Sequence, residues 1–278
     1  LKNSEATLPL PAAVKNVALF GCCSYDFIAG GTGSGNVNHA YVVSLVDGLK
    51  NANMTIDADL AASYTKHIKE QKEILAHAND GERLAQFLPI PLPKELTFGG
   101  NMLKAKADAT DAAIITIGRL SGEFLDRKVA DFNLSADEHK LIADVCSAYH
   151  AVGKKVIVLL NIGGVIETAS WKEQPDAILC AWQAGQEGGN SVADVLTGKA
   201  SPSGKLAMTW PVSYADHAST KNFPIDIMPE FNMTNHGTLK HERKDYDYTN
   251  YEEDVFVGYR YFASFGVPVS YPFGYGLS

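Results

Sequence analysis

The stretch AAIITIGRLSGEFLDR, residues 112–127, decides how the rest of the chain is interpreted. It begins with an apolar, β-branched run, residues 113–117, of the kind that fills a buried strand. Gly118 ends the run, and charged residues crowd the turn that follows. In an open α/β sheet, ligands bind where strands end at their carboxyl edge. Glu123, which follows Gly122 in this turn, is therefore a candidate catalytic acid, although a solvated loop with an ordinary ion pair explains the same residues.

Three further charged residues flank this carboxylate, namely Arg119, Asp126 and Arg127. A positive charge beside a carboxylic acid lowers its pKa, whereas a carboxylic acid that donates a proton in catalysis needs a raised pKa. We therefore expect the two arginines to brace the turn, or to pair with Asp126 or other groups, rather than to contact Glu123.

Composition excludes several classes of protein. The chain has 278 residues, enough for one large domain or two small ones, with 46% hydrophobic and 20% charged residues, as in ordinary globular proteins. A net charge of −8 and a pI near 5.5 argue against nucleic-acid binding, which needs clustered Lys and Arg. No run reaches the roughly 18 apolar residues that a membrane helix requires. Residues 1–11 lack the basic start and apolar core of a signal peptide.

The chain starts without Met and ends abruptly at PFGYGLS, so we expect a piece of a longer protein. The sequence does not show in which cellular compartment the parent protein lies, and a periplasmic or extracellular location is our guess. The four cysteines form neither a disulfide framework nor a CxxC or Cys/His pattern. We expect four buried free thiols, no metal site and no cofactor.

Buried strands alternate with amphipathic helices along most of the chain. We expect strands at 14–21, 54–58, 113–117, 155–160, 177–182 and 205–210, and helices at 39–52, 64–78, 135–151 and 191–196. Ser135 and Glu138 have the spacing of a capping box. This alternation predicts an α/β fold, a three-layer α/β/α sandwich with a mostly parallel, doubly wound sheet.

The predicted sandwich domain covers residues 1–211, with an irregular excursion at 79–109 that ends in a helix. Residues 212–278 are expected to form a long arm and a C-terminal segment that pack on the same domain. Within the arm, residues 212–255 are polar and aromatic without a helical or strand period, and we assign no role to their acidic side chains.

The glycine-rich stretch GGTGSG, residues 30–35, follows the first expected strand. It lacks the phosphate-binding patterns of nucleotide sites, and Ser34 lacks the flanking glycines of a nucleophile elbow. What remains is a loop whose backbone approaches a ligand closely, with a hydroxyl at its tip. Sugar hydroxyls suit such a group, while a tight surface turn is the alternative. His39, just beyond the loop, is expected to belong to the start of a helix.

Several segments together resemble one family. GGTGSG, GRLSGEFLDRK, AILCAWQAGQEGGNSVADVLTGKASPSGKLAMTWP and YEEDVFVGYRYF with the closing YPFGYGLS are similar to the second domain of glycoside hydrolase family 3, which includes β-glucosidases and β-xylosidases. The resemblance covers nearly the whole chain in order. It implies an α/β sandwich that lends an acid/base Glu to a preceding barrel domain carrying the nucleophilic Asp.

By this resemblance, Glu123 is the acid/base residue, and Ser34, with Gly33 and Gly35 around it, reaches the sugar. The implied reaction is retaining hydrolysis of β-linked glycosides or oligosaccharides, releasing sugars from the non-reducing end without metal or cofactor. Glu123 would protonate the leaving oxygen and later activate water, at about 5–5.5 Å from the barrel carboxylate. This segment alone is then expected to be inactive.

Two other functions stay open at this point. The first is a non-catalytic carbohydrate-binding or structural module of the same fold, which a gene without an upstream barrel would favour. The second is a flavodoxin-like nucleotide-binding domain, which the acidic charge and the missing phosphate motif disfavour. The sequence does not reveal which sugar or linkage the protein would accept.

Overall fold

The computed structural model describes residues 1–77, 91–123, 127–221 and 252–277. Its centre is a six-stranded sheet with the order β1-β6-β5-β4-β2-β3. Its strands are β1 (Lys2–Asn3), β2 (Asn16–Phe20), β3 (Thr55–Ile56), β4 (Ala112–Arg119), β5 (Val156–Ile162) and β6 (Ala177–Cys180). Every neighbouring pair is parallel except the edge pair β1 and β6. The prediction of a mostly parallel sheet is confirmed.

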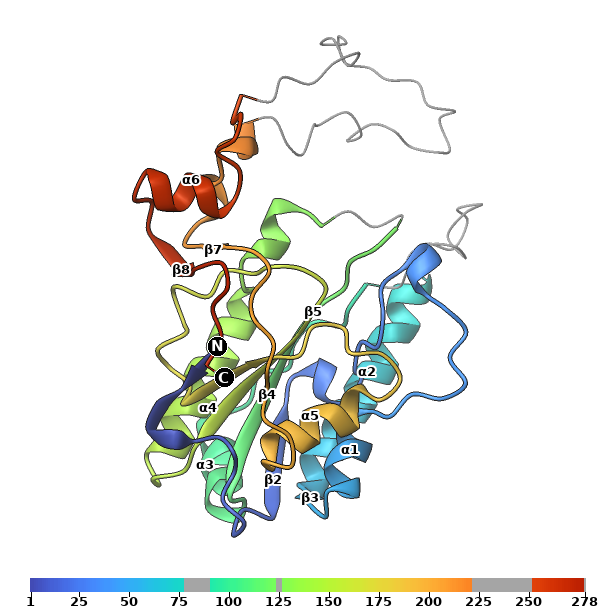
Figure 1. Cartoon of the computed structure of the whole chain (residues 1–278). Helices are drawn as coiled ribbons and strands as arrows, with labels where there is room; N and C mark the ends of the chain where they lie inside the picture. Colours follow the sequence, from blue (N-terminus) through green and yellow to red (C-terminus); the bar gives the residue numbers. More distant parts are fainter. Residues whose placement is uncertain (78–90, 124–126, 222–251, 278) are drawn as a thin grey trace.

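Helices cover both faces of this sheet, as Figure 1 shows. On one face lie α1 (Leu45–Asn51) and α5 (Gly188–Leu196), whose apolar side chains share a buried cluster with Ile114. On the other lie α2 (Ala58–His77), α3 (Gly100–Ala109) and α4 (Ala136–His150), which pack with Ile115. The chain is therefore the three-layer α/β/α sandwich that the sequence predicts.

Both faces of strand β4 are covered, and from Ala112 to Ile117 its only polar side chain is Thr116, whose hydroxyl is hydrogen-bonded to the Ser24 hydroxyl. Ala113, Ile115 and Ile117 belong to one buried cluster, whereas Ala112 and Ile114 belong to the other. Successive side chains of a strand point to opposite faces, so a strand between two helical layers needs a nearly continuous apolar run. Each fully buried isoleucine contributes about 1.5–3 kcal/mol of transfer free energy.

Helix α4 starts at the expected capping box. The Ser135 hydroxyl accepts a hydrogen bond from the Glu138 backbone N–H at 3.2 Å, and the Glu138 carboxylate accepts one from the Ser135 N–H at 2.7 Å. Two N–H groups that lack partners within the helix are thereby satisfied. The predicted helix at 135–151 is confirmed.

Three element predictions are wrong at their boundaries. The helix expected at 64–78 begins at Ala58, after the Asp57 carboxylate, which accepts a hydrogen bond from the Leu60 N–H at 2.9 Å. The helix expected at 39–52 begins at Leu45, because the Ser44 side chain caps it by accepting a hydrogen bond from the Asp47 N–H at 3.1 Å. His39 therefore lies outside the helix. Residues 205–209 form no strand, and Trp210 belongs to a separate small sheet rather than to the main one. The strand propensity of residues 205–210 does not add a strand to the main sheet, because β1 already pairs with β6 at that edge.

The C-terminal part returns to the sandwich through that second sheet. β7 (Trp210–Pro211) pairs antiparallel with β8 (Val269–Tyr271), and α6 (Tyr259–Ser264) lies between them in sequence. Figure 1 shows α6, β7 and β8 at one end of the sandwich, in orange to red. Much of the predicted arm, 222–251, and residues 79–90 of the predicted excursion lie outside the described residues. The division into 1–211 and 212–278 stays a prediction.

No helix in the described parts of the chain is both long and apolar enough to cross a membrane.

Candidate active site

The candidate site lies where the direction of the chain's crossovers reverses. In the sheet order, β3 lies on one side of β2 and β4 on the other. In open α/β sheets, ligands bind outside the carboxyl ends of the strands at such a reversal, which here falls between β2 and β4. The glycine-rich loop follows β2 and the Glu123 turn follows β4, so the topology brings both sequence-predicted segments to this end of the sheet.

The two segments meet at Glu123. The Ser34 backbone N–H donates a hydrogen bond to Glu123 Oε2 at 2.7 Å, and the Ser34 hydroxyl donates a second, short one to the same oxygen. The Thr32 hydroxyl donates to the Glu123 backbone carbonyl at 2.6 Å. Three hydrogen bonds thus join loops about 90 residues apart in sequence. We call this arrangement of Thr32, Ser34 and Glu123 the clasp.

The clasp requires glycine at two positions. A Cβ on Gly33, whose φ is +58°, would lie 2.4 Å from the Glu123 Cβ, and one on Gly122 would lie 2.3 Å from the Thr32 nitrogen. Only glycine adopts such backbone conformations at low cost and leaves this space open. Gly35 differs, because nothing lies within 4 Å of the place where its Cβ would be. The loop is therefore rich in glycine for close approach at Gly33, not at Gly35.

Glu123 is exposed, and its hydrogen bonds from the Ser34 hydroxyl and N–H hold the pKa of its carboxyl below the ordinary value of 4.5. Donors that bond to a carboxylate favour its charged form. In this chain Glu123 is thus an ionised, solvent-facing carboxylate at neutral pH. A proton donor needs the opposite shift, so the clasp alone does not make Glu123 an acid.

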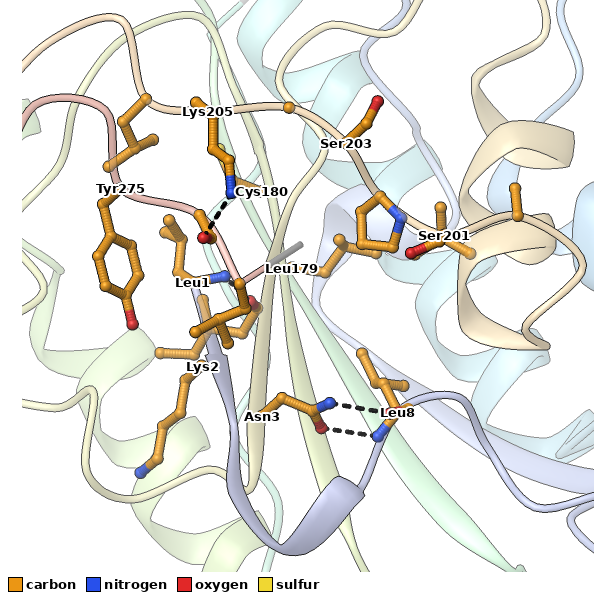
Figure 2. Close-up of a pocket in the computed structure, with 18 of the residues that line it drawn as sticks. Leu1, Lys2, Asn3, Leu8, Leu179, Cys180, Ser201, Ser203, Lys205 and Tyr275 are labelled. Atoms are coloured by element: carbon orange, nitrogen blue, oxygen red, sulfur yellow. Dashed lines mark hydrogen bonds between the residues drawn. The ribbon is translucent and has the colours of Figure 1, made fainter.

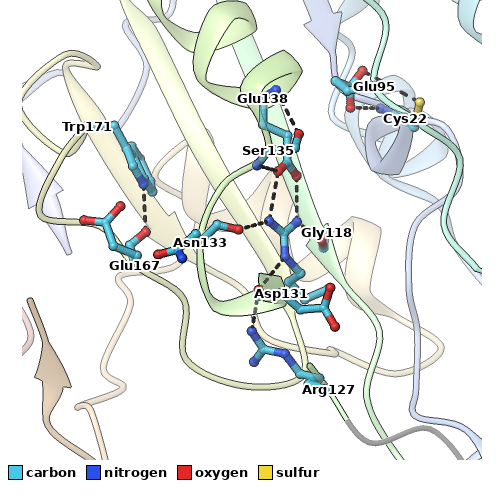
Figure 3. Close-up of polar contacts among 11 residues, drawn as sticks. Cys22, Glu95, Gly118, Arg127, Asp131, Asn133, Ser135, Glu138, Glu167 and Trp171 are labelled. Carbon is cyan, nitrogen blue, oxygen red and sulfur yellow. Dashed lines mark hydrogen bonds and ion pairs between the residues drawn. The ribbon is translucent and has the colours of Figure 1, made fainter. Parts of the chain in front are cut away.

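Arg119, at the end of β4, pairs with Glu138 and does not contact Glu123. Its Nη1 and Nη2 atoms donate to the two carboxylate oxygens of Glu138 at 2.6 and 2.9 Å (Figure 3). The same guanidinium also donates to the carbonyl oxygens of Gly118, Asp131 and Asn133. A planar fork of five donors suits such a site, which lysine could not fill. Glu138 thus both caps α4 and anchors the strand end that leads to Glu123.

Arg127 takes backbone partners. It donates to the Val165 carbonyl at 3.0 Å and to the Asp131 carbonyl at 2.8 Å, the second of which Figure 3 shows. Burial, and after it the nearby Arg119, lowers the pKa of its guanidinium. In the described part of the chain it forms no ion pair. Asp126 lies outside the described residues, so its expected pairing with an arginine stays a prediction.

Two roles at this site are not predicted from the sequence, those of Thr32 and of Glu138 as the partner of Arg119. Thr32 lies within GGTGSG, where the glycines drew attention and the one β-branched hydroxyl did not. Glu138 was recognised only as a capping residue. Its second role depends on Arg119, 19 residues away, and no local pattern predicts that contact.

A cavity of about 410 Å³ lies away from this site, beside β1 and β6. Figure 2 shows Leu1, Lys2 and Asn3 on one side of it and Ser201 and Ser203 on another. Neither Glu123 nor Ser34 lines it. The four cysteines are free thiols, as predicted, and Cys22, Cys23 and Cys146 are buried. Cys180 is only half-buried, so the prediction of a buried thiol is wrong at that position. The described residues contain no group of three or more side chains suited to hold a metal ion.

Comparison with known proteins identifies this architecture. Residues 1–278 match the glycosyl hydrolase family 3 C-terminal domain. The chain belongs to this family. Over all of its length, this family 3 domain is 36% identical to a β-glucosidase A of Butyrivibrio fibrisolvens and covers 33% of that protein. It is 30% identical to an exo-α-(1→6)-L-arabinopyranosidase of Bifidobacterium longum, of which it covers 31%.

A solved structure agrees with the fold. β-Glucosidase 3B of Thermotoga neapolitana, in complex with glucose, is 42% identical to the whole family 3 domain, with a TM-score of 0.83 over 36% of the solved chain. The domain therefore spans about a third of the length of these three proteins.

Proposed function

We propose that this family 3 domain supplies the acid/base carboxylate of a retaining, exo-acting β-glycosidase, β-glucosidase-like in specificity, and that Glu123 is that carboxylate. The nucleophilic carboxylate would come from an N-terminal barrel domain of the parent protein. The observation that carries the proposal is the position of Glu123, exposed at the carboxyl edge of the sheet yet held by Ser34 and Thr32. Such a group is oriented for chemistry but is accessible to a substrate held by another domain.

The hydrogen bonds leave one carboxylate oxygen for catalysis. Both bonds from Ser34 go to Oε2, and no described residue donates to Oε1. In a retaining mechanism, the acid protonates the departing glycosidic oxygen while a second carboxylate attacks the anomeric carbon. Glu123 would carry that proton on Oε1, and the same atom would then take a proton from the water that releases the sugar. Ser34 would keep the carboxyl group from rotating during both steps.

Docking with the barrel would raise the pKa of Glu123. Loss of solvent and a second carboxylate nearby both favour the protonated form of an acid. The domain alone provides neither influence, and its Glu123 has a lowered pKa. The acid would therefore form only when the two domains meet, which accounts for the expected inactivity of this chain alone.

The test uses the full-length parent protein and its Glu123→Gln variant, with the 278-residue chain as a control. We expect the variant to lose about 10²–10⁴-fold in kcat/KM on an alkyl β-glucoside, whose leaving group needs a proton. An activated aryl glucoside should lose less, and added azide should restore turnover by forming a glycosyl azide. Equal, unrescued losses on both substrates would overturn the assignment of Glu123.

A non-catalytic sugar-binding module is the second candidate, since the clasp leaves a polar, solvent-facing surface. Calorimetry of the parent with glucose and cellobiose separates the two functions. Binding without turnover of any aryl glycoside would favour the module.

A further inference from the structure

One polar side chain interrupts the apolar core of β5. Asn161 lies near the end of the strand VIVLLNI, is completely buried, and is paired in register with Gly118 of β4. A buried amide without partners costs several kcal/mol in order of magnitude. Its presence at this depth therefore calls for hydrogen bonds, and the structure shows them.

The Asn161 amide is matched to the backbone of Ile28. Oδ1 accepts a hydrogen bond from the Ile28 N–H at 2.7 Å, and Nδ2 donates to the Ile28 carbonyl at 2.9 Å. The second proton of Nδ2 goes to the Trp182 carbonyl at 2.8 Å. Because Ile28 offers one donor and one acceptor, only one orientation of the amide satisfies all three bonds.

These bonds connect two loops above the sheet edge. Ile28 lies just before the glycine-rich loop after β2, whereas Trp182 follows β6. Trp182 has a φ of +52°, which costs free energy in a bulky residue and persists only where neighbours enforce it. A backbone hydrogen bond from Gly185 to the Ala29 carbonyl at 2.9 Å joins the same two loops.

The loop that Asn161 holds is the loop that carries the clasp. From Ile28 the chain continues through Gly31, whose Cβ would lie 2.9 Å from the Ser121 carbonyl, to Thr32 and Ser34. Both of those residues hold Glu123. A shift of the loop start would thus be passed along a short chain of close contacts to the carboxylate.

We propose that Asn161 is a positioning residue for Glu123, which acts through the backbone of Ile28 and the clasp. This inference rests on the proposed function. Asn161 touches no substrate. It sets where the loop begins, and thereby the direction in which Glu123 presents its free oxygen. The step that depends on it is proton transfer to the leaving oxygen, whose rate falls when donor and acceptor are displaced by about 1 Å.

The sharpest variant is Asn161→Asp in the full-length parent protein. It keeps size and shape but places an oxygen against the carbonyls of Ile28 and Trp182, where Nδ2 donated. Thr110→Val serves as the matched control. Thr110 is also buried, and it makes its bonds to the Lys106 carbonyl and the Tyr149 hydroxyl beside the amino end of β4. We expect Thr110→Val to reduce stability without changing the contacts of Thr32, Ser34 and Glu123.

The readout is kcat/KM on a series of aryl β-glucosides with rising leaving-group pKa, together with the melting temperature. For Asn161→Asp we expect a loss of about tenfold or more on the poorest leaving group and little loss on the most activated one. Thr110→Val should lower the melting temperature without changing the dependence on the leaving group. If Asn161→Asp behaves like Thr110→Val, with a uniform loss or none, the proposal is overturned.

Two further measurements keep the outcome decisive. If Asn161→Asp does not fold, Asn161→Ser removes the amide and leaves room for water, and its leaving-group dependence is judged by the same criterion. Glu123→Gln is measured on the same series. If the loss in kcat/KM of Glu123→Gln does not depend on the leaving-group pKa, the proposed function has failed. If that loss rises with the leaving-group pKa for Glu123→Gln but not for either Asn161 variant, the positioning role alone is rejected.

Discussion

Gly33 and Glu123 approach each other so closely that a Cβ on Gly33 would lie 2.4 Å from the Cβ of Glu123. The contact explains why the glycine-rich loop and the acidic turn behave as one unit, although they belong to different crossovers of the sheet. The backbone of Gly33 also has a positive φ, which any other residue adopts only with strain. Both features make this position sensitive to a single methyl group.

We expect Gly33→Ala to open the clasp and raise the pKa of Glu123 toward its ordinary value. The pKa is low because Ser34 donates to the carboxylate, and the alanine side chain would push the two loops apart. Carbon-detected NMR titration of the glutamate carboxyls measures this shift. Gly35→Ala is the matched control, since its Cβ meets nothing within 4 Å. An unchanged Glu123 titration in Gly33→Ala would contradict the role of the glycine.

Arg119→Met is expected to destabilise the chain by about 3–5 kcal/mol, because it leaves the mostly buried carboxylate of Glu138 without its counter-charge. Urea unfolding at neutral pH measures the free energy. Lys140→Met is the control, since its pair with Asp144 is largely exposed and such pairs contribute about 0.2–1 kcal/mol. Similar losses of unfolding free energy in the two variants would show that the buried Arg119–Glu138 pair contributes no more than an exposed pair.

Asp176 makes stability depend on pH in the acid range. Burial by itself would raise the pKa of this carboxyl, but hydrogen bonds from the Val156 N–H and from the His150 and Lys155 side chains outweigh it and lower the pKa below 3.8. A carboxyl with a lowered pKa in the folded state stabilises the fold above its unfolded pKa. That contribution is lost as the pH falls through the folded pKa.

We therefore expect Asp176→Asn to cost about 1–3 kcal/mol at pH 7 and progressively less at pH values below 3.8. Unfolding free energies of both proteins, measured from pH 7 down to the acid limit of folding, test this. A difference that stays constant over that range would mean that the charge of Asp176 contributes nothing.

Gly48 in α1 and Gly189 in α5 let two helices touch through their backbones. A Cβ on Gly48 would lie 2.1 Å from the Gly189 carbonyl oxygen. Glycine to alanine in a helix ordinarily stabilises by about 0.5–1 kcal/mol, but here the methyl group would force the helices apart. We expect Gly48→Ala to lower stability by about 1–3 kcal/mol.

The control for this prediction is Gly100→Ala at the start of α3, where a Cβ meets nothing within 4 Å. Thermal unfolding should show opposite signs for the two alanines. A gain in stability for Gly48→Ala would mean that α1 and α5 can separate at no cost.

Much of the sandwich could be predicted from local patterns. The start of β4, residues 112–117, is recognisable because a strand covered on both faces carries mostly apolar side chains. The Ser135 capping box is equally local. The error at Leu45 concerns a local signal, because the Ser44 side chain caps α1 within an apolar stretch. The error at Trp210 arose where a local pattern competes with a contact from another segment, since an edge strand from the N-terminus takes the place beside β6.

The sequence by itself determined the fold class, the family resemblance and the candidate acid Glu123, because each depends on residues close together in the chain. Only the tertiary structure decided which groups act on that acid. Ser34 reaches it because β2 and β4 are neighbours at the point where the crossovers reverse. Arg119 is turned toward Glu138, and Asn161 holds Ile28, through contacts of 19 and 133 residues in sequence separation. Such contacts depend on strand order and register, which local composition does not specify.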